Sequence, residues 1–305
     1  MLFGACNALK TYRSMTISKL QKKGFTSHTI QLKTGKMFYF SGGNGFPLIF
    51  IHGFGFDAAE TWKNQMMDFV GQYRVFAPDI FWFGKSIPST KMDTAAQQAD
   101  ALAELMDHHS LAKAHVVGIS FGGFIALQFA RRHPNKLARL VLVDAAGLHP
   151  TKEEEKKAAA NFKYAKGDPI RLLIPKNEAE LGKFLKGVFY KAPYIPGFVM
   201  DDILTTEFWK NKEAKARIIR KMRKGGLVPL KKFKEIKAKT LLIWGRHDRL
   251  LLPSMGKRMA KAIPGSKLVF LEKSGHCPML EEPKKFSKLL TDFLDKRLPS
   301  PSSSK

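Results

Sequence analysis

The sequence predicts an α/β fold built on a mostly parallel central sheet. Short runs rich in β-branched and aromatic residues, at positions 47–51 and 137–143 for example, alternate with longer segments whose apolar residues recur at helical spacing. Glycine-rich polar signatures follow several of these runs directly, at residues 118–123, 245–248 and 274–276. Parallel strands joined by helices have their carboxyl ends at one edge of the sheet, so these signatures are expected to meet there.

The charge of the chain is strongly positive. Its 305 residues include 52 Lys or Arg and 26 Asp or Glu, which gives a formal net charge of +26. Much of this excess lies in residues 1–36 and 210–239. Basic surfaces attract anionic lipid head groups and other polyanions. We therefore weigh peripheral contact with an anionic membrane against a merely solvated basic surface; no aromatic-interleaved motif points to nucleic acid.

Cysteine content and hydropathy indicate a reduced protein without a membrane span. Cys6 and Cys277 are the only cysteines and suggest no disulfide framework. No run approaches the roughly 18 apolar residues of a transmembrane helix. Residues 2–6 bear a faint likeness to a lipoprotein cleavage box, but the basic and apolar segments that precede such a box are missing, so that interpretation requires a start further upstream. We expect a cytoplasmic protein.

The chain opens with a basic arm, residues 1–26. Residues 9–23 can form a helix that is either a membrane-surface anchor or a loosely docked arm, and the residues roughly on one side of it are Leu9, Tyr12, Thr16 and Leu20. Residues 28–33 and 37–40 then alternate as two strands around Thr34 and Gly35. This pattern predicts a hairpin at an antiparallel edge of the sheet.

The first part of the core spans residues 27–147. Its first buried strand, 47–51, ends in His52-Gly53-Phe54-Gly55. Because glycine lets backbone approach a ligand closely, the backbone N–H of Phe54 is expected to be one donor of an oxyanion hole. His52 is interpreted as a structural hydrogen-bonding residue rather than as a base.

An aromatic loop at residues 80–86 follows a predicted helix at 58–70 and a strand at 73–77. Asp57 is the expected cap of that helix. Trp82 and Phe83 in the loop either pack over the sheet edge or line an apolar substrate pocket. A further helix is expected at residues 94–109.

The central strand, 115–119, leads into the segment Gly118-Ile119-Ser120-Phe121-Gly122. This G-x-S-x-G pattern is typical of a strained turn between a strand and a helix, where no side chain fits two residues before or after the serine. Ser120 is then a candidate nucleophile. The N–H of Phe121, at the start of the helix, is the candidate second oxyanion donor.

Residues 148–239 break the alternation of strands and helices. No clear strand is evident, and helix-like segments rich in Lys, Phe and Tyr are interrupted by prolines and glycines. This predicts an inserted helical cap. Its aromatic residues exceed what a small surface excursion needs to bury, and those expected at the substrate pocket are Phe189, Tyr194 and Phe198.

The second part of the core, residues 240–297, supplies two more candidate catalytic residues. Asp248 follows a strand at 240–244, and His276 follows a strand at 268–271. A serine hydroxyl needs a histidine to take its proton and a carboxylate to orient that histidine, and the chain order Ser, Asp, His fits this arrangement. Asp144 is the alternative acid. The Ser- and Pro-rich tail, residues 298–305, is expected to be disordered.

With these motifs in place, the chain resembles the α/β-hydrolase superfamily, in the capped branch of serine esterases, lipases and monoacylglycerol-lipase-like enzymes. The resemblance covers roughly residues 27–297 apart from the cap. Carried over to this sequence, the family's nucleophile, acid, base and two oxyanion donors fall on Ser120, Asp248, His276, Phe54 and Phe121. The loop that usually reads Asp-x-Pro-Gly-x-Gly departs from the family at residues 79–84, and this departure bears on the shape of the substrate pocket and not on the triad.

The resemblance implies hydrolysis of carboxylic esters with apolar acyl chains, such as monoacylglycerol, through an acyl-enzyme. It implies no metal, no other cofactor and no obligate protein partner. Carbon–carbon bond hydrolases and haloperoxidase-like enzymes share the triad, and a non-enzymatic ligand receptor on the same fold stays open as well. Dehalogenases and epoxide hydrolases of the superfamily attack with aspartate, whereas this chain has Ser120.

Overall fold

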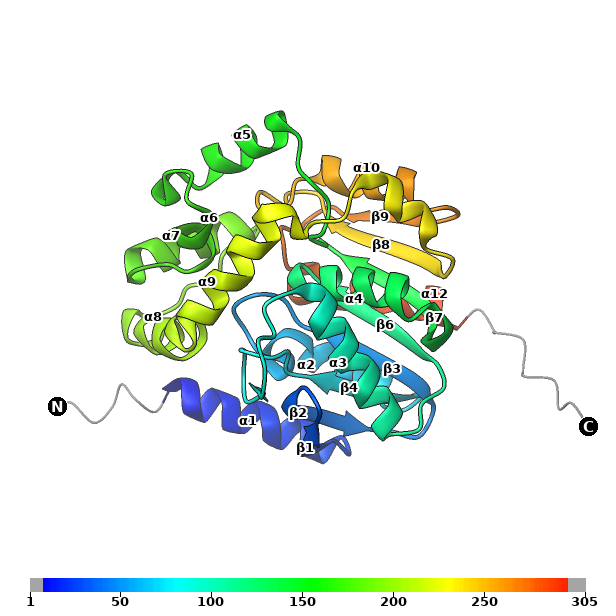
Figure 1. Cartoon of the computed structure of the whole chain (residues 1–305). Coiled ribbons are helices and arrows are strands. Elements are labelled where there is room, and N and C mark those ends of the chain that lie inside the picture. The colour runs from blue at the N-terminus through cyan, green and yellow to red at the C-terminus, as the bar shows by residue number, and fades with distance from the viewer. Residues whose placement is uncertain (1–7, 296–305) are drawn as a thin grey trace, which may run out of the picture.

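One sheet organises the molecule. The computed structural model describes residues 8–295, and the nine strands within that range lie in the order β1-β2-β4-β3-β6-β7-β8-β9, with the short β5 paired to β2 (Figure 1). The hairpin of β1 and β2 is antiparallel, and β2 is also antiparallel to β4. All pairs from β4 to β9 are parallel. The predicted α/β fold with an antiparallel hairpin at one edge is confirmed.

The strands agree closely with the predicted ones. Their bounds are β1 (Thr26–Leu32), β2 (Gly35–Gly42), β3 (Phe46–Ile51), β4 (Tyr73–Pro78), β5 (Ile87–Pro88), β6 (Ala114–Ile119), β7 (Leu137–Val143), β8 (Lys239–Gly245) and β9 (Lys267–Leu271). Only β5 had no counterpart in the sequence prediction, because a two-residue strand leaves no periodic pattern.

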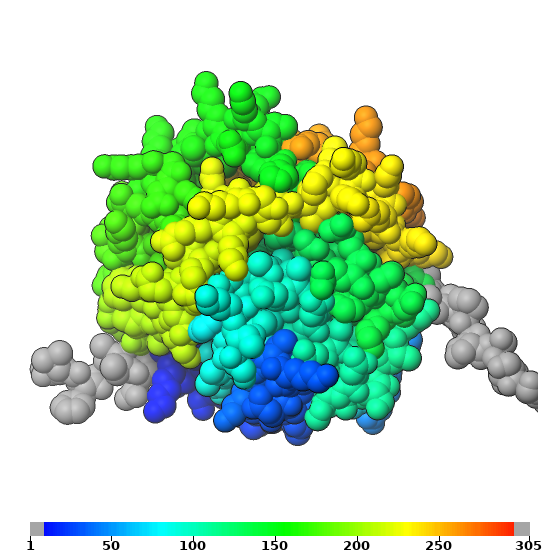
Figure 2. Space-filling model, in the orientation of Figure 1, coloured from blue at the N-terminus to red at the C-terminus, as the bar shows by residue number. Residues whose placement is uncertain are grey.

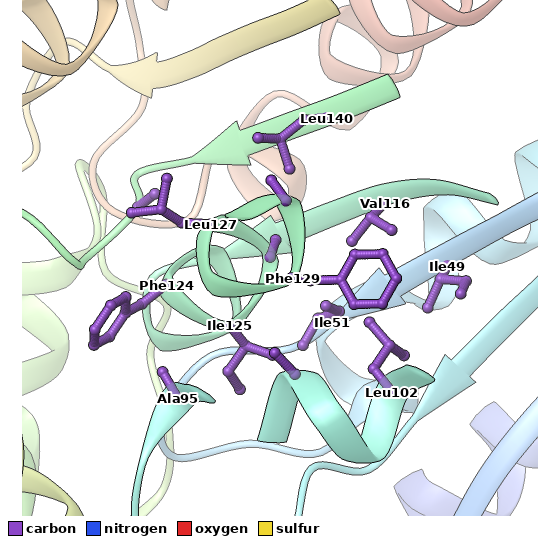
Figure 3. Close-up of a cluster of buried hydrophobic side chains, with 14 of the residues drawn as sticks. Ile49, Ile51, Ala95, Leu102, Val116, Phe124, Ile125, Leu127, Phe129 and Leu140 are labelled. Carbon is purple, nitrogen blue, oxygen red and sulfur yellow. The ribbon is translucent and has the colours of Figure 1, made fainter. Parts of the chain in front are cut away.

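Helices cover both faces of the sheet. On one face lie α3 (Ala95–His108), α4 (Phe121–Arg132) and α10 (Pro253–Ala262); on the other lie α2 (Ala58–Phe69), α11 (Pro278–Glu281) and α12 (Pro283–Leu294). Side chains of β3 alternate between the two cores: Ile49 packs with α3 and α4, whereas Phe50 packs with α2. Figure 3 shows Phe129 of α4 directed at the sheet beside Val116 and Ile49.

The segment between β7 and β8 is helical, and we refer to residues 148–238 as the helical insertion. Its elements are α5 (Lys152–Asn161), η3 (Lys163–Ala165), α6 (Pro169–Leu173), α7 (Glu178–Val188), α8 (Gly197–Ile203), η4 (Leu204–Trp209), α9 (Lys212–Lys221), η5 (Met222–Gly226) and η6 (Leu230–Glu235). They gather at one end of the sheet and lie against the first part of the core (Figures 1 and 2). The only β-type pairing within the insertion is an isolated bridge between Leu148 and Val228.

The insertion is fastened to the core by polar contacts. Lys210 Nζ donates to the carbonyl oxygen of Gly84 at 2.7 Å, and Asn211 Nδ2 donates to that of Trp82 at 3.1 Å. Arg217 pairs with the buried carboxylate of Asp93 at 3.1 Å. The first two contacts hold the turn before α9 against the aromatic loop at residues 80–86, and the third holds α9 against Asp93.

Helix α1 (Ala8–Lys22) is packed on the rest of the molecule. Of the face predicted for it, Leu9, Thr16 and Leu20 are buried, whereas Tyr12 is 44 % exposed. Its Arg13 pairs with Glu60 of α2 and with Glu207 of the insertion, so that α1 bridges the core and the insertion. The helix is therefore docked more firmly than the sequence indicated. Its ion pairs join residues far apart in the chain, and the local sequence pattern does not reveal them.

Two expectations fall outside the described residues. The faint lipoprotein box at residues 2–6 and the tail at residues 298–305 both lie beyond the range 8–295. Inside that range, none of the helices combines the length and the apolar character that crossing a bilayer requires.

Candidate active site

Ser120 occupies a strained turn between β6 and α4. Its φ and ψ are 53° and −118°, a region that residues other than glycine rarely adopt. A Cβ on Gly118 would lie 2.3 Å from the carbonyl oxygen of Gly122, and one on Gly122 would lie 2.2 Å from that of His52. The two glycines that bracket Ser120 are therefore required by the close approach of backbone, as the sequence pattern indicates.

Two backbone N–H groups flank the serine. Phe121 is the first residue of α4, where an N–H has no partner within the helix, and Phe54 lies in the loop after β3. Across residues 8–295, neither N–H donates to another protein group. A Cβ on Gly53 would lie 3.3 Å from Cβ of Ser120, so the loop that carries Phe54 passes close to the serine. Both groups are free to bind an oxyanion.

His276 and Asp248 form a buried hydrogen-bonded pair. His276 Nδ1 lies 2.7 Å from Asp248 Oδ2, and the side chains are 8 % and 0 % exposed. The other oxygen, Asp248 Oδ1, accepts from the backbone N–H groups of Leu250 and Leu251 at 2.8 and 2.9 Å. Three donors thus fix this carboxylate, and the contact keeps a proton on Nδ1 so that Nε2 can act as a base.

Ser120 and His276 line the same pocket. In the described part of the chain, no hydrogen bond joins the two side chains. Such catalytic contacts are often long in a free enzyme and tighten when substrate binds. The structure therefore brings Ser120, His276 and Asp248 to one place, with the contact between histidine and aspartate already formed.

Asp144, the alternative acid, lies next to Asp248 and has another partner. It accepts a hydrogen bond from the backbone N–H of Gly245 at 3.0 Å and is completely buried. Burial and the neighbouring charge of Asp248 raise the pKa of Asp144 well above its usual value. This shift favours the neutral form of Asp144, whereas Asp248 is the carboxyl group in contact with the His276 ring.

His52 is held by backbone on both sides of its ring. Nδ1 donates to the carbonyl oxygen of Gly53 at 2.8 Å, and Nε2 accepts from the N–H of Ile80 at 2.9 Å. Complete burial lowers the pKa of His52 to about 4, so the ring stays neutral. Both nitrogens are occupied, which leaves His52 no means to serve as a base for Ser120.

Two apolar pockets meet at Ser120. The first, about 370 Å³, runs under α5 and α6 and is here named the α5 pocket; its apolar lining includes Leu148, Ala158, Phe162, Leu172, Leu227 and Met255. The second, about 520 Å³, runs beside α7 and α8 toward α1 and is named the α7 pocket; its apolar lining includes Phe56, Phe184, Val188, Ile195, Val199 and Leu280. Ser120 and Phe54 line both pockets, whereas His276 lines only the α7 pocket.

Comparisons with known proteins identify the family of this chain. A family model described as the alpha/beta hydrolase fold matches residues 47–283. The chain belongs to the α/β-hydrolase family. Lipase 1 of Psychrobacter immobilis is 31% identical over 280 residues, covering 90% of this chain and 86% of the lipase. This α/β hydrolase is also 29% identical to the 2-hydroxy-6-oxo-6-phenylhexa-2,4-dienoate hydrolase of Burkholderia cepacia, over 90% of this chain and 94% of that enzyme.

Among solved structures, this α/β hydrolase is similar to a membrane phospholipase A described as a bacterial virulence factor. The two superpose with a TM-score of 0.81 at 27% identity, over 96% of this chain and 92% of the other. The match therefore includes the helical insertion as well as the sheet.

The structure separates the residues expected at the substrate pocket. Phe189 and Tyr194 line the α7 pocket. Trp82, Phe83 and Phe198 line neither of the two pockets at Ser120. Phe198 is half exposed on α8, and the side chain of Arg217 lies over the Trp82 ring, which places Trp82 at the contact between loop and insertion.

Phe83 has an indirect place beside the site. It is 2 % exposed, and its ring packs against those of Phe54 and His52 with centroids 5.0 and 5.8 Å apart. It therefore supports the loop that carries one candidate oxyanion donor. Sequence reasoning missed Leu9 and Tyr12 of α1, which line the α7 pocket, because nothing in their local pattern links them to residues more than a hundred positions away.

One set of side chains in the described range has the spacing of a metal site. Asp144, Asp248 and His276 each offer an atom within 4.8 Å of the others. The contact between Nδ1 of His276 and Asp248 already uses two of these side chains, and burial favours the protonated form of Asp144 by raising its pKa. The arrangement fits a proton-transfer relay better than a cation site.

Proposed function

We propose that this α/β hydrolase cleaves carboxylic esters with apolar acyl chains, a class that includes monoacylglycerol, with Ser120, His276 and Asp248 as its catalytic triad. Its lipase relatives indicate a carboxylic ester hydrolase. The observation that carries the proposal is the strained Ser120 in an apolar pocket shared with His276, whose ring is bonded to Asp248.

Acylation begins with proton transfer from Ser120 Oγ to His276 Nε2. The serine oxygen forms a bond to the ester carbonyl carbon, and the carbonyl oxygen becomes an oxyanion that the N–H groups of Phe54 and Phe121 stabilise. The bond between that carbon and the alcohol oxygen then breaks, and His276 gives its proton to the departing alcohol. Asp248 balances the positive charge on the imidazole throughout.

Deacylation repeats the sequence with water as the nucleophile. His276 takes a proton from water, the new carbon–oxygen bond forms, and the bond to Ser120 Oγ breaks as His276 returns the proton to the serine. The products are the carboxylic acid and the free enzyme. No group from outside the protein other than water is needed.

The test compares Ser120→Ala with a surface control. Ser287→Ala is the control because Ser287 lies on α12 and bonds only to Asp68 on the surface. With 4-nitrophenyl butyrate, we expect the kcat of Ser120→Ala to be lower than that of the wild type by a factor of at least about 10⁴. The kcat of Ser287→Ala should match that of the wild type. A fluorophosphonate probe should label the wild type and Ser287→Ala but not Ser120→Ala. Undiminished hydrolysis by Ser120→Ala would refute the assignment.

The second candidate is hydrolysis of a carbon–carbon bond. It is favoured by the extended similarity to the dienoate hydrolase of Burkholderia cepacia. Because both reactions use the same triad, the discriminating assay supplies a 2-hydroxy-6-oxo-dienoate beside the ester: faster turnover of the dienoate would select this candidate. A haloperoxidase-like enzyme carries the same triad, so cleavage of the ester alone does not distinguish it. A ligand receptor would turn over neither substrate and would label slowly with the fluorophosphonate.

We also propose that the helical insertion acts as a cap and that this end of the molecule touches anionic lipid. Tyr12 and Met15 of α1 are exposed, as are Tyr194 and Phe198 near the α8 helix that packs on α1. Lys10, Lys19 and Lys22 lie exposed on the same helix. Exposed apolar residues with lysines beside them suit an anionic interface.

Cosedimentation with vesicles tests the lipid contact. We expect binding to vesicles of phosphatidylglycerol but little binding to phosphatidylcholine, with a loss of binding at high salt. The double variant Met15→Ser and Phe198→Ser should bind at least about fivefold more weakly, since these exposed side chains line neither pocket. Equal binding of the variant and the wild type would overturn this contact surface.

A further inference from the structure

The two pockets at Ser120 differ in which catalytic groups they contain. Both are open to the serine and to Phe54, but His276 lines only the α7 pocket and Phe121 lines only the α5 pocket. Each has a volume in the range of about 300–1,000 Å³ typical of ligand sites. The reacting carbon of a substrate bound at Ser120 therefore has an apolar pocket on either side, and the two sides are not chemically equivalent.

The position of His276 decides which side takes which part of an ester. The departing alcohol must receive its proton from His276 Nε2, so it has to lie on the side of the imidazole. The acyl group stays on Ser120 and must lie on the other side, away from His276. This places the alcohol in the α7 pocket and the acyl chain in the α5 pocket.

Two polar contacts of the α7 pocket involve residues of α1, so they lie toward the end of the pocket where α1 packs. Glu60 pairs with Arg13, and Lys63 Nζ contacts the hydroxyl of Tyr12 toward the pocket's α1 end. Deeper in, next to His276, the pocket is walled by Leu185, Val188 and Met279. A small polar alcohol such as glycerol would leave these apolar walls without a partner, whereas an alcohol that carries its own apolar chain would cover them.

We propose that the substrate is an ester with an apolar chain on each side of the carbonyl, its acyl chain in the α5 pocket and the chain of its alcohol in the α7 pocket. This inference rests on the proposed ester hydrolysis at Ser120 and narrows its substrate class. Long-chain alkyl esters and two-chain lipids belong to this class. Monoacylglycerol, whose leaving group is glycerol, is then a poorer substrate.

Four simple esters test the inference on the intact protein. Methyl hexanoate and pentyl acetate are isomers that carry their longer chain on opposite sides of the carbonyl; pentyl hexanoate carries both chains and methyl acetate neither. Acid release at constant pH gives kcat/KM for each. We expect each longer chain to raise kcat/KM by about tenfold or more, with pentyl hexanoate the best of the four.

Two matched variants separate the pockets. Ala158 of α5 lines only the α5 pocket, Val199 of α8 lines only the α7 pocket, and both are half-buried positions on helices of the insertion. Ala158→Trp should lower kcat/KM for methyl hexanoate at least tenfold and leave pentyl acetate within about twofold. Val199→Trp should do the reverse. Methyl acetate, which reaches into neither pocket, reports whether each variant is folded and active.

Three outcomes would overturn the assignment. If the wild type cleaves pentyl acetate no better than methyl acetate, the α7 pocket takes no alcohol chain, and this result needs no variant. If Ala158→Trp impairs pentyl acetate and Val199→Trp impairs methyl hexanoate, the two sides are exchanged. If both variants affect both isomers equally, the pockets do not act separately. Failure of the proposed function looks different, because the wild type would then cleave none of the four esters.

Discussion

Asp144 and Asp248 follow neighbouring strands of the sheet, yet only Asp248 is bonded to His276, at 2.7 Å. Asp144 is instead bonded to the N–H of Gly245, and burial beside Asp248 raises its pKa well above the usual value. Two carboxyl groups placed so close cannot both carry a charge without strong repulsion. Of the two carboxyl groups, Asp248 is therefore the one placed to face the imidazole.

Substitution of each aspartate by asparagine is the first prediction. Asp248→Asn should lower kcat for 4-nitrophenyl butyrate by about 10³–10⁴, because the imidazole loses the charge that stabilises its protonated form. Asp144→Asn puts a neutral side chain of similar shape where burial already raises the pKa of the carboxyl, and it should cost less than about tenfold in kcat. Equal losses in the two variants would mean that Asp144 shares the role of the acid.

The glycines of the turn at Ser120 give the second prediction. Gly122→Ala places a Cβ 2.2 Å from the carbonyl oxygen of His52, and it should lower the free energy of unfolding by about 2–3 kcal/mol. Gly182→Ala is the matched control inside α7, where a Cβ meets nothing within 4 Å. The control should be neutral or should stabilise by up to about 1 kcal/mol. Urea unfolding measures both, and equal stability of the two variants would contradict the steric argument.

Arg13 supplies the third prediction. Arg13→Ala leaves Glu60 and Glu207 without their shared partner and should lower the free energy of unfolding by about 1–3 kcal/mol at pH 8. Burial raises the pKa of Glu60 to about 7, so its contribution to stability is present below pH 4.5 and is lost as the pH rises through about 7. The difference in free energy of unfolding between Arg13→Ala and the wild type should therefore be smaller at pH 5 than at pH 8.

The control for Arg13 lies on the same helix. Lys10 is exposed, and Lys10→Ala removes its side chain. The free energy of unfolding of this variant should match that of the wild type at both pH values. Urea midpoints at pH 5 and pH 8 provide the comparison. A gap for Arg13→Ala that stays constant between these pH values would show that Glu60 does not titrate in this range.

His115 gives a fourth prediction, in which a contribution to stability is lost as the pH falls rather than as it rises. It is 2 % exposed, and burial lowers its pKa to about 4 from 6.5. A neutral buried histidine contributes stability that is present above pH 6.5 and is lost as the pH falls through about 4, with a slope of up to about 1.4 kcal/mol per pH unit. His115→Leu lacks this titration. The free energy of unfolding of the wild type should therefore fall relative to that of the variant as the pH drops from 6.5 to 4. Parallel stability curves would contradict the prediction.

The sheet and the turn at Ser120 were predictable because their signals are local. A buried strand such as β7 (Leu137–Val143) is a short apolar run, and the glycines around Ser120 reflect contacts within a few residues. The hydrogen bond of His276 to Asp248 spans 28 residues, and it was indicated by chain order, by the place of each residue after a strand and by the family resemblance.

Pocket residues were harder to predict because helices far apart in the chain build the pockets. Phe189 and Tyr194 reach the α7 pocket, but Trp82 and Phe198, equally aromatic, do not. A high aromatic content indicates that a segment buries apolar side chains, but it does not indicate which surface these side chains pack against. The link from Arg13 to Glu207 spans 194 residues and has no local signature at all.

Helix α1 precedes the part of the chain that the family model matches, residues 47–283, yet its Leu9 and Tyr12 form part of the wall of the α7 pocket. A chain trimmed to the shared family region would keep Ser120 and lose one wall of the α7 pocket, to which we assign the alcohol. Selectivity among esters can therefore diverge between relatives through their opening residues alone, while every catalytic position stays the same.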